Sequence, residues 1–148
     1  MYSLAPKGQV LWEEHELGEP GLITVDVFQK DVRALKDPGT TFAKLKVGDY
    51  VFAAREHIVV VEEKRVADLL TSWKSRRLQR QLRRIKQANP DGINILALRA
   101  SGSVPSLNEM LWLDAPAELS LDLLKWQALG GLLGFLPHYP QGVLDTLK

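Results

Sequence analysis

The stretch IVVVEEK, Ile58 to Lys64, constrains the fold most, because four β-branched residues run directly into three charged ones. An unbroken apolar run of this kind, without glycine or proline, predicts a strand that is buried in the core. Side chains alternate between the two faces of a strand, so Glu62 and Lys64 point the same way and Glu63 points the other way. A carboxylate and an ammonium group therefore share one face where the apolar surface of the strand ends.

Neighbouring segments predict how this strand pairs. DYVFAA, residues 49–54, predicts a short strand, and about two residues separate it from the strand at 56–64, which favours a hairpin. LITVDVF, residues 22–28, is apolar and β-branched and predicts an earlier strand. Residues 36–48 contain a Pro-Gly pair and predict a loop.

Three carboxylates and one lysine converge at one edge of the sheet if these strands are neighbours: Asp26, Asp49, Glu62 and Lys64. Two carboxylates and a backbone carbonyl are suitable ligands for Mg²⁺, which keeps several of its waters. A bound metal acidifies water and neutralises charge on a phosphoryl oxygen, and a lysine beside it can orient the water. Spacing alone leaves two interpretations open, a metal-dependent phosphodiester site and a surface salt-bridge cluster at a strand end.

Residues 65–87 have a helical pattern with two apolar stripes that do not coincide. One stripe consists of Val66, Leu69, Leu70 and Trp73. The other stripe is rotated by roughly 120° in a continuous helix, and it consists of Leu78, Leu82 and Ile85. One straight helix cannot bury both stripes on one core, so we predict a break near residues 74–76.

The second half of the chain alternates helices with apolar strands. After a turn at residues 89–92, the pattern predicts a strand at 93–100, a loop at 101–106, a helix at 119–130, a strand at 132–138 and a terminal helix at 140–148. Strands that alternate with helices after an early hairpin indicate an α/β fold. We predict a single domain over residues 1–148, with an N-terminal extension at 1–20 and a mixed central sheet flanked by helices.

Basic residues are concentrated in one segment, although the net charge of the whole chain is only +1. Residues 69–90 contain no aspartate or glutamate. The same segment carries seven basic residues, which are Lys74, Arg76, Arg77, Arg80, Arg83, Arg84 and Lys86. Such a run is either a solvated helix face or a surface that binds phosphates.

Several classes of protein are disfavoured by what the sequence lacks. The absence of cysteine removes disulfides, thiolate nucleophiles and cysteine zinc sites, and it fits a reducing cytosol. The first residues do not resemble a signal peptide, the apolar segment 119–136 carries charges, and we find no nucleotide-binding signature. We expect a cytoplasmic protein without membrane contact or nucleotide cofactor. The histidines do not have the spacing of a metal motif: His15, His57 and His138.

Three motifs, read in order, resemble the XPF-type (ERCC-type) structure-specific endonucleases: VGDYV at 47–51, VEEKRVADLLTS at 61–72 and RLQRQLRR at 77–84. That family has a G-D strand start, then E-R-K-x-x-x-D-L, then a helix with R-L-x-x-Q. LITVD, at residues 22–26, looks like the opening strand of the family. The resemblance covers roughly residues 22–85 and implies the restriction-endonuclease-like fold of the PD-(D/E)XK group.

The resemblance implies roles for the residues at matching positions. Asp49 and Glu62, with the Glu63 backbone carbonyl, match the ligands of Mg²⁺ or Mn²⁺. Lys64 matches the catalytic lysine, and Asp26 matches the aspartate of the first strand. Supporting roles are implied for Asp68, Arg77 and Gln81. Contacts to DNA phosphates are assigned to Lys74, Arg76, Arg77, Arg80, Arg83 and Arg84.

The chain departs from the family pattern at four positions. Glu63 stands where the family usually has arginine, and Arg99 stands where it often has glutamate. Phe28 and Gln29 stand where it usually has arginine and glutamate. Because the acids and the lysine of the core motif are intact, we predict a metal-dependent DNA endonuclease that cuts flaps, forks or junctions. The alternatives are a degenerate DNA-binding or partner subunit with this fold, and an interaction domain whose basic helix is solvated.

The resemblance also carries expectations about assembly and context. Members of the family often work as dimers, and the apolar helix around residues 119–133 offers a homodimer interface. No tandem helix-hairpin-helix domain follows in this sequence, which implies a stand-alone nuclease domain of bacterial or phage type. The family implies a role in DNA repair or recombination.

Overall fold

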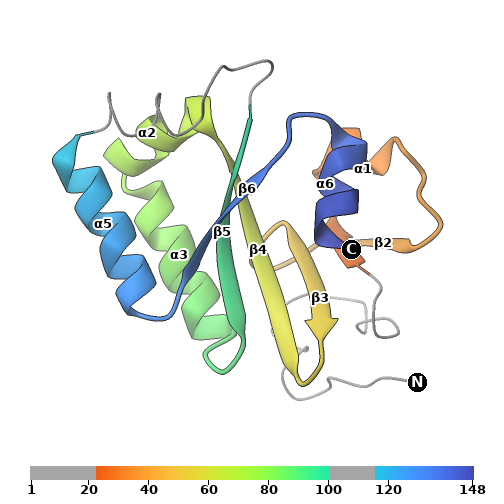
Figure 1. The fold of residues 1–148 in the computed structure, drawn as a ribbon, viewed down its shortest axis with the longest axis horizontal. Coiled ribbons are helices and arrows are strands. Elements are labelled where there is room, and N and C mark those ends of the chain that lie inside the picture. The colour runs from red at the N-terminus through yellow and green to blue at the C-terminus, as the bar shows by residue number, and fades with distance from the viewer. Residues whose placement is uncertain (1–22, 101–115) are drawn as a thin grey trace.

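A mixed six-stranded sheet forms the centre of the protein (Figure 1). The computed structural model describes residues 23–100 and 116–148. Strand β3 runs antiparallel to its neighbours β1 and β4, and the other neighbouring strands pair in parallel. The predicted α/β class with a mixed sheet is confirmed. The strands lie in the order β2 (Thr40–Ala43), β1 (Ile23–Asp26), β3 (Tyr50–Ala54), β4 (His57–Arg65), β5 (Ile93–Arg99) and β6 (Leu132–Leu136).

Helices cover both faces of this sheet (Figure 1). On one face, Leu96 and Leu98 of β5 join a buried cluster with side chains of α2, α3 and α5. On the other face, Val59 and Val61 of β4 join a buried cluster with side chains of α1 and α6. Both faces of the central strands are therefore covered, as their apolar sequences require. The helices are α1 (Lys30–Arg33), α2 (Val66–Lys74), α3 (Arg77–Ala88), α5 (Ala117–Ala128) and α6 (Pro140–Leu147).

The predicted break in the basic helix is confirmed between α2 and α3. Lys74 ends α2, and Arg76 has a φ of 64°, in the left-handed region, immediately before α3 begins. The reversal lets both apolar stripes reach one core, where Leu69 of α2 packs with Leu78 and Leu82 of α3. The basic outer face of α3 is thereby left on the surface of the protein.

Two elements were not predicted. The segment at 36–48, predicted to be a loop, contains β2, which pairs in parallel with β1 at the edge of the sheet. A strand of four residues with a single large apolar side chain, Phe42, has too weak an alternation to be recognised from its sequence. The single turn of α1 was also missed, because four residues cannot show a helical period. The first strand is shorter than predicted, since it ends at Asp26 rather than Phe28.

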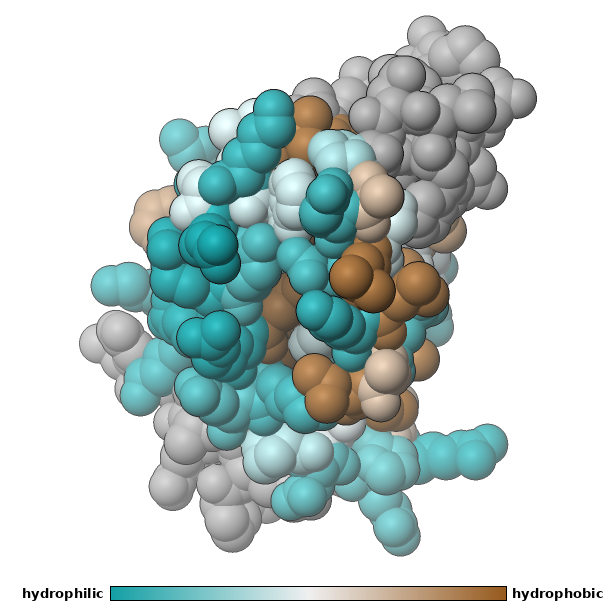
Figure 2. Space-filling view, turned by 90° about the vertical axis from the view of Figure 1, so that its left-hand side faces the viewer, coloured by the Kyte–Doolittle hydropathy of each residue, from teal (hydrophilic) through white to brown (hydrophobic). Residues whose placement is uncertain are grey.

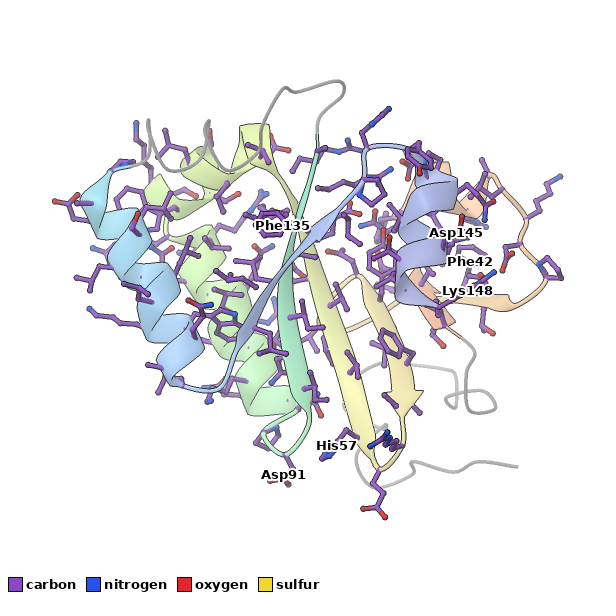
Figure 3. All side chains as sticks on the ribbon, in the orientation of Figure 1. Phe42, His57, Asp91, Phe135, Asp145 and Lys148 are labelled. Atoms are coloured by element: carbon purple, nitrogen blue, oxygen red, sulfur yellow. The ribbon has the colours of Figure 1, made fainter. Side chains whose placement is uncertain are left out.

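Some features lie away from the site or outside the described ranges. His57 begins β4 at the hairpin, and Figure 3 shows it with Asp91 at one end of the sheet, far from the top of β4. The predicted extension at 1–20, the loop at 101–106 and His15 lie outside the described residues. Within the ranges that the structure describes, no helix is long and apolar enough to cross a membrane.

Candidate active site

Three neighbouring strands, β1, β3 and β4, bring the predicted acids together near the points where these strands begin or end. The Asp26 N–H donates to the Asp49 carbonyl at 2.9 Å, and the Asp49 N–H donates to the Val61 carbonyl at 2.8 Å. Main-chain hydrogen bonds therefore connect the end of β1, the start of β3 and the last part of β4. Asp26, Asp49 and Glu62 line one hollow of about 210 Å³ with Gln81 of α3. The three acids therefore lie together, as we expected from the sequence.

A glycine permits the close approach of the chain just before Asp49. Gly48 has a φ of +74°, and a Cβ atom there would lie 2.5 Å from a methyl carbon of Val60. Only glycine fits this position without strain, because the left-handed conformation and the contact both exclude a side chain. The G-D pair of the sequence therefore has a structural cause, which is the placement of Asp49 against β4.

The carboxyl groups of Asp49 and Glu62 lie close enough together for the charge of one to act on the pKa of the other, and the effect is clearest at Glu62. Burial and the neighbouring Asp49 charge raise the pKa of Glu62 to about 8. Burial also raises the pKa of Asp49, to about 6, although a hydrogen bond from the Glu63 N–H to Asp49 Oδ2 at 2.7 Å opposes that shift. The pKa values of both acids are thus raised, that of Glu62 more than that of Asp49. Two neighbouring acids of this kind form a site that a cation can occupy in place of a proton.

The expected metal fits this donor set in part. In a strand the N–H and C=O of one residue point to the same side, so the Glu63 carbonyl faces Asp49 as its N–H does. Two carboxylates and one carbonyl leave several positions for water, as Mg²⁺ requires. Over the described residues, no group of three or more histidine, cysteine, aspartate or glutamate side chains is placed to hold a metal ion.

Asp26 lies in the hollow but is engaged in holding the surrounding loops. Its Oδ2 accepts a hydrogen bond from the Phe28 N–H at 3.1 Å, and its Oδ1 accepts one from the Leu45 N–H at 2.9 Å. Each carboxylate oxygen thus accepts one main-chain hydrogen bond and keeps a further lone pair. The two bonds fix the orientation of the Asp26 carboxylate in the hollow.

Lys64 reaches the same region from the face of β4 that carries Glu62. Its Nζ donates to Gln81 Oε1 at 2.9 Å, and the residue is only 6% exposed. Burial lowers the pKa of Lys64, and the positive charge of Arg77 lowers it further, while Glu62 raises it. Arg77 and Asp68 line a second, polar hollow next to Lys64. The structure thus brings all three predicted supporting residues to the lysine, and Gln81 fixes its ammonium group directly.

Sequence reasoning missed the contact of Gln29 with the site. The Gln29 side chain hydrogen-bonds to the Asp49 carboxyl group. The sequence showed Gln29 only as a departure from the family pattern, at a position three residues after Asp26. A neutral amide there supports Asp49 without adding a further negative charge to the acid pair.

Two departures from the family pattern form one ion pair on the opposite face of the sheet. Arg99 is fully buried, its Nη1 lies 3.3 Å from Glu63 Oε1, and its Nη2 contacts Asp31 Oδ2 at 2.5 Å. The Tyr50 hydroxyl donates to Glu63 Oε1 at 2.8 Å. Burial alone would lower the pKa of Arg99, but the hydrogen bond to Asp31 and the charge of Glu63 raise it. The Glu63 side chain therefore binds Arg99 and Tyr50 on the face of the sheet opposite Glu62, and it does not point toward the acid pair.

The basic residues of α2 and α3 form a band beside the site. Arg84 of this band lines the hollow of the acid pair and donates to the Lys46 carbonyl at 3.1 Å, while Arg77 lines the hollow beside Lys64. Figure 2 shows the face of the molecule that α3 and α5 form, with hydrophilic side chains gathered on one side and hydrophobic ones on the other. The exposed members of the band are Lys74, Arg76, Arg77, Arg80, Arg83 and Arg84.

The raised pKa values predict that the metal-free protein loses stability as the pH rises. A carboxyl group whose pKa is higher in the folded state stabilises the fold at low pH, and that contribution disappears as the pH rises through the folded pKa. We expect the free energy of unfolding to fall by on the order of 2 kcal/mol between about pH 5 and pH 8 because of the acid pair. Denaturant titrations in the presence of a chelator measure this loss.

The matched control is Glu62→Gln, which keeps the shape of the side chain and removes its charge. This variant should lose less stability over the same pH range, and at pH 8 it should be more stable than the unchanged protein. Addition of Mn²⁺ should restore stability to the unchanged protein and not to the variant. If the free energy of unfolding depends on pH identically in the two proteins, the raised pKa of Glu62 does not affect stability.

Comparison with known proteins finds one matching domain and two similar structures. Residues 25–97 match the ERCC4 domain. The chain is similar in structure to XPF from Aeropyrum pernix, with 20% identity, a TM-score of 0.61, and coverage of 84% of this chain and 60% of that one. A structure of the same XPF in complex with DNA gives 20% identity, a TM-score of 0.57, and coverage of 86% and 61%. The chain thus spans about three fifths of the length of these structures.

A search of curated proteins found no match. The structural likeness agrees with the mixed sheet and flanking helices described above, and the domain match runs from the end of β1 through β2, β3, β4 and the basic helices into β5. The chain therefore contains an ERCC4 domain over residues 25–97 and has the restriction-endonuclease-like fold of the XPF nuclease domain.

Proposed function

We propose that this protein is a metal-dependent DNA endonuclease that hydrolyses phosphodiester bonds in branched or otherwise structured DNA. The observation that carries the proposal is the acid pair of half-buried Asp49 and buried Glu62, which lies on the same face of the sheet as Lys64. The site lies within the residues that match the ERCC4 domain, and the resemblance to XPF-type endonucleases implies structure-specific cleavage of DNA. Incubation of a labelled branched duplex with the protein and Mg²⁺ or Mn²⁺ tests the proposal directly.

Each residue of the site has a role in this reaction. Asp49, Glu62 and the Glu63 carbonyl would hold the metal, which when bound supplies an acidified water and neutralises phosphate charge. Lys64, whose pKa is lowered by burial, donates hydrogen bonds to the attacking water or to a phosphate oxygen. Gln81 fixes the ammonium group, so Lys64 needs no reorientation when DNA arrives.

We infer that the basic band of α2 and α3 binds the DNA backbone. Replacing Arg80 and Arg83 with glutamine should lower affinity for any DNA and reduce the slope of log K against log salt by about 0.9 for each phosphate that the protein no longer neutralises. Binding measured at several salt concentrations gives this slope. The control is Arg33→Gln, because Arg33 is exposed on α1 at the other face of the sheet. An equal change of slope in the control would argue against a specific band.

A DNA-binding subunit without catalysis is the second candidate. Two neutral residues, Phe28 and Gln29, favour it, because they stand where the resemblance implies a charged pair. Salt-sensitive binding to branched DNA without cleavage in any divalent metal would select this function over the first.

Assembly and location extend the proposal. Side chains of α5 and β6 expose apolar surface, including Leu124 at 61% and Phe135 at 47%, and we propose that a second copy of the chain covers them. Figure 3 labels Phe135 on β6. Sedimentation over a hundredfold range of protein concentration distinguishes a dimer from a monomer.

We place the protein in the cytoplasm, in keeping with the absence of cysteine from its sequence. We further propose that residues 1–148 form one nuclease domain and that the protein acts in DNA repair or recombination.

A further inference from the structure

The ring of Phe28 is exposed at the mouth of the candidate active site. Phe28 is 70% exposed, and it lines both the hollow of Asp49 and Glu62 and the hollow beside Lys64. In the part of the chain that the structure describes, the other large hydrophobic side chains that are exposed lie on α5, on β6 and beside them: Leu121, Leu124, Leu129, Leu132, Phe135 and Tyr139. Among the described residues that line these two hollows, Phe28 is thus the large hydrophobic side chain that is exposed, whereas Leu45, Val47 and Ile85 are partly or fully buried.

The backbone of Phe28 is held in place, so its exposure does not come from a loose loop. The Phe28 N–H donates to Asp26 Oδ2 at 3.1 Å, and its carbonyl accepts from the Lys30 N–H at 2.9 Å. The next residue, Gln29, hydrogen-bonds to Asp49. The turn that carries the ring is therefore held by Asp26 on one side and connected to Asp49 through Gln29 on the other, which places the ring beside the acid pair.

The surroundings of the ring are those of a surface that binds nucleic acid. Exposed cations border the two hollows that Phe28 separates: Lys30, Lys44, Lys46, Arg65, Arg77 and Arg84. A DNA strand whose phosphate reaches Asp49 and Glu62 places the neighbouring sugar and base at the wall of the same hollow. Proteins that bind single strands combine such cations with an exposed aromatic ring on which a base stacks.

We propose that Phe28 stacks on an unpaired base next to the scissile phosphate, which deepens the proposed function and rests on it. In a duplex both faces of each base are covered by its neighbours, whereas an unpaired nucleotide offers a free face to an aromatic side chain. An exposed ring at this place therefore selects substrates in which the nucleotide at the cut has left the stack. The class of substrate is DNA with a single-stranded segment at the cleavage point, such as a flap or a fork.

Three substitutions of Phe28 separate stacking from other effects. All are made in a Glu62→Gln background, so that binding is measured without cleavage, on a flap substrate and on a fully paired duplex of the same sequence. Phe28→Ala and Phe28→Leu should lower the ratio of flap affinity to duplex affinity about tenfold, and Phe28→Trp should keep it. Leucine retains apolar bulk without an aromatic face, so its failure to substitute for phenylalanine identifies stacking.

A fluorescent base reports the contact directly. With 2-aminopurine at the unpaired position next to the expected cut, stacking on Phe28 should quench its fluorescence, and Phe28→Leu should restore the signal. An unchanged affinity ratio in Phe28→Ala, or equal quenching in Phe28→Leu, would overturn the proposal. Cleavage by the unchanged protein is scored separately, so absence of cleavage with intact quenching rejects the nuclease function and leaves the stacking role standing.

Discussion

Glu62→Gln and Lys64→Met should each slow cleavage of branched DNA by about a thousandfold or more. Glutamine at 62 removes one of the two carboxylates that would hold a metal ion. Methionine at 64 removes the ammonium group that Gln81 holds at 2.9 Å. Both residues are buried, and the substituted side chains have a similar size, so the fold should be retained. Initial rates with saturating Mn²⁺ measure the effect.

The matched controls use the same substitutions on exposed residues away from the site. The control variants are Glu56→Gln and Lys36→Met. Glu56 is at the hairpin before β4, and Lys36 follows α1. Both control variants should cut at the rate of the unchanged protein, and all four should bind branched DNA without metal. If Glu62→Ala and Lys64→Ala proteins both cleave normally, the assignment of the active site is wrong.

Arg99→Met should destabilise the protein by about 3–5 kcal/mol, because it leaves the buried Glu63 carboxylate without a counter-charge. The Arg99 side chain is 0% exposed, that of Glu63 is 6% exposed, and Asp31 also contacts the guanidinium group. Methionine fills a similar volume but provides neither charge nor hydrogen bond. The free energy of unfolding from denaturant titration at neutral pH measures the loss.

Arg65→Met is the control for this substitution. Arg65 also faces Asp31, at 3.7 Å, but its side chain is 43% exposed, so its loss should cost under about 1 kcal/mol. A second variant, Arg99→Met with Glu63→Gln, should recover part of the stability because the unpaired carboxylate is removed with the arginine. Equal losses for Arg65→Met and Arg99→Met would show that burial does not strengthen this pair.

Strand alternation and helix phase, which depend on neighbouring residues, predicted part of the fold from the sequence. The β-branched run before Glu62 predicts β4, and the phase shift between the two apolar stripes predicts the break beside Arg76. The faces that Glu62 and Glu63 take also follow from strand alternation. The edge strand β2 was missed because its position depends on pairing with β1, and four residues carry little pattern of their own.

Contacts between distant residues could not be derived from one sequence. Glu63 and Arg99 looked like two separate departures, although they are 36 positions apart and form one buried pair. Each charge compensates the other, and the chemistry of neither residue alone indicates this. The same holds for Gln29, whose bond to Asp49 depends on how the turn after β1 folds back over β3.

Side chains of β4 alternate between two faces that both have functions, so the length of this strand is more strictly constrained than its composition. Glu62 serves the acid pair on one face, and Glu63 serves Arg99 on the other, so both functions depend on a single register. Inserting or deleting one residue within the strand would exchange the two carboxylates and disable the site and its support together. Length changes can be absorbed at the exposed hairpin near His57, at the far end of the sheet. Tolerance to changes in length should therefore differ sharply between the two ends of one strand.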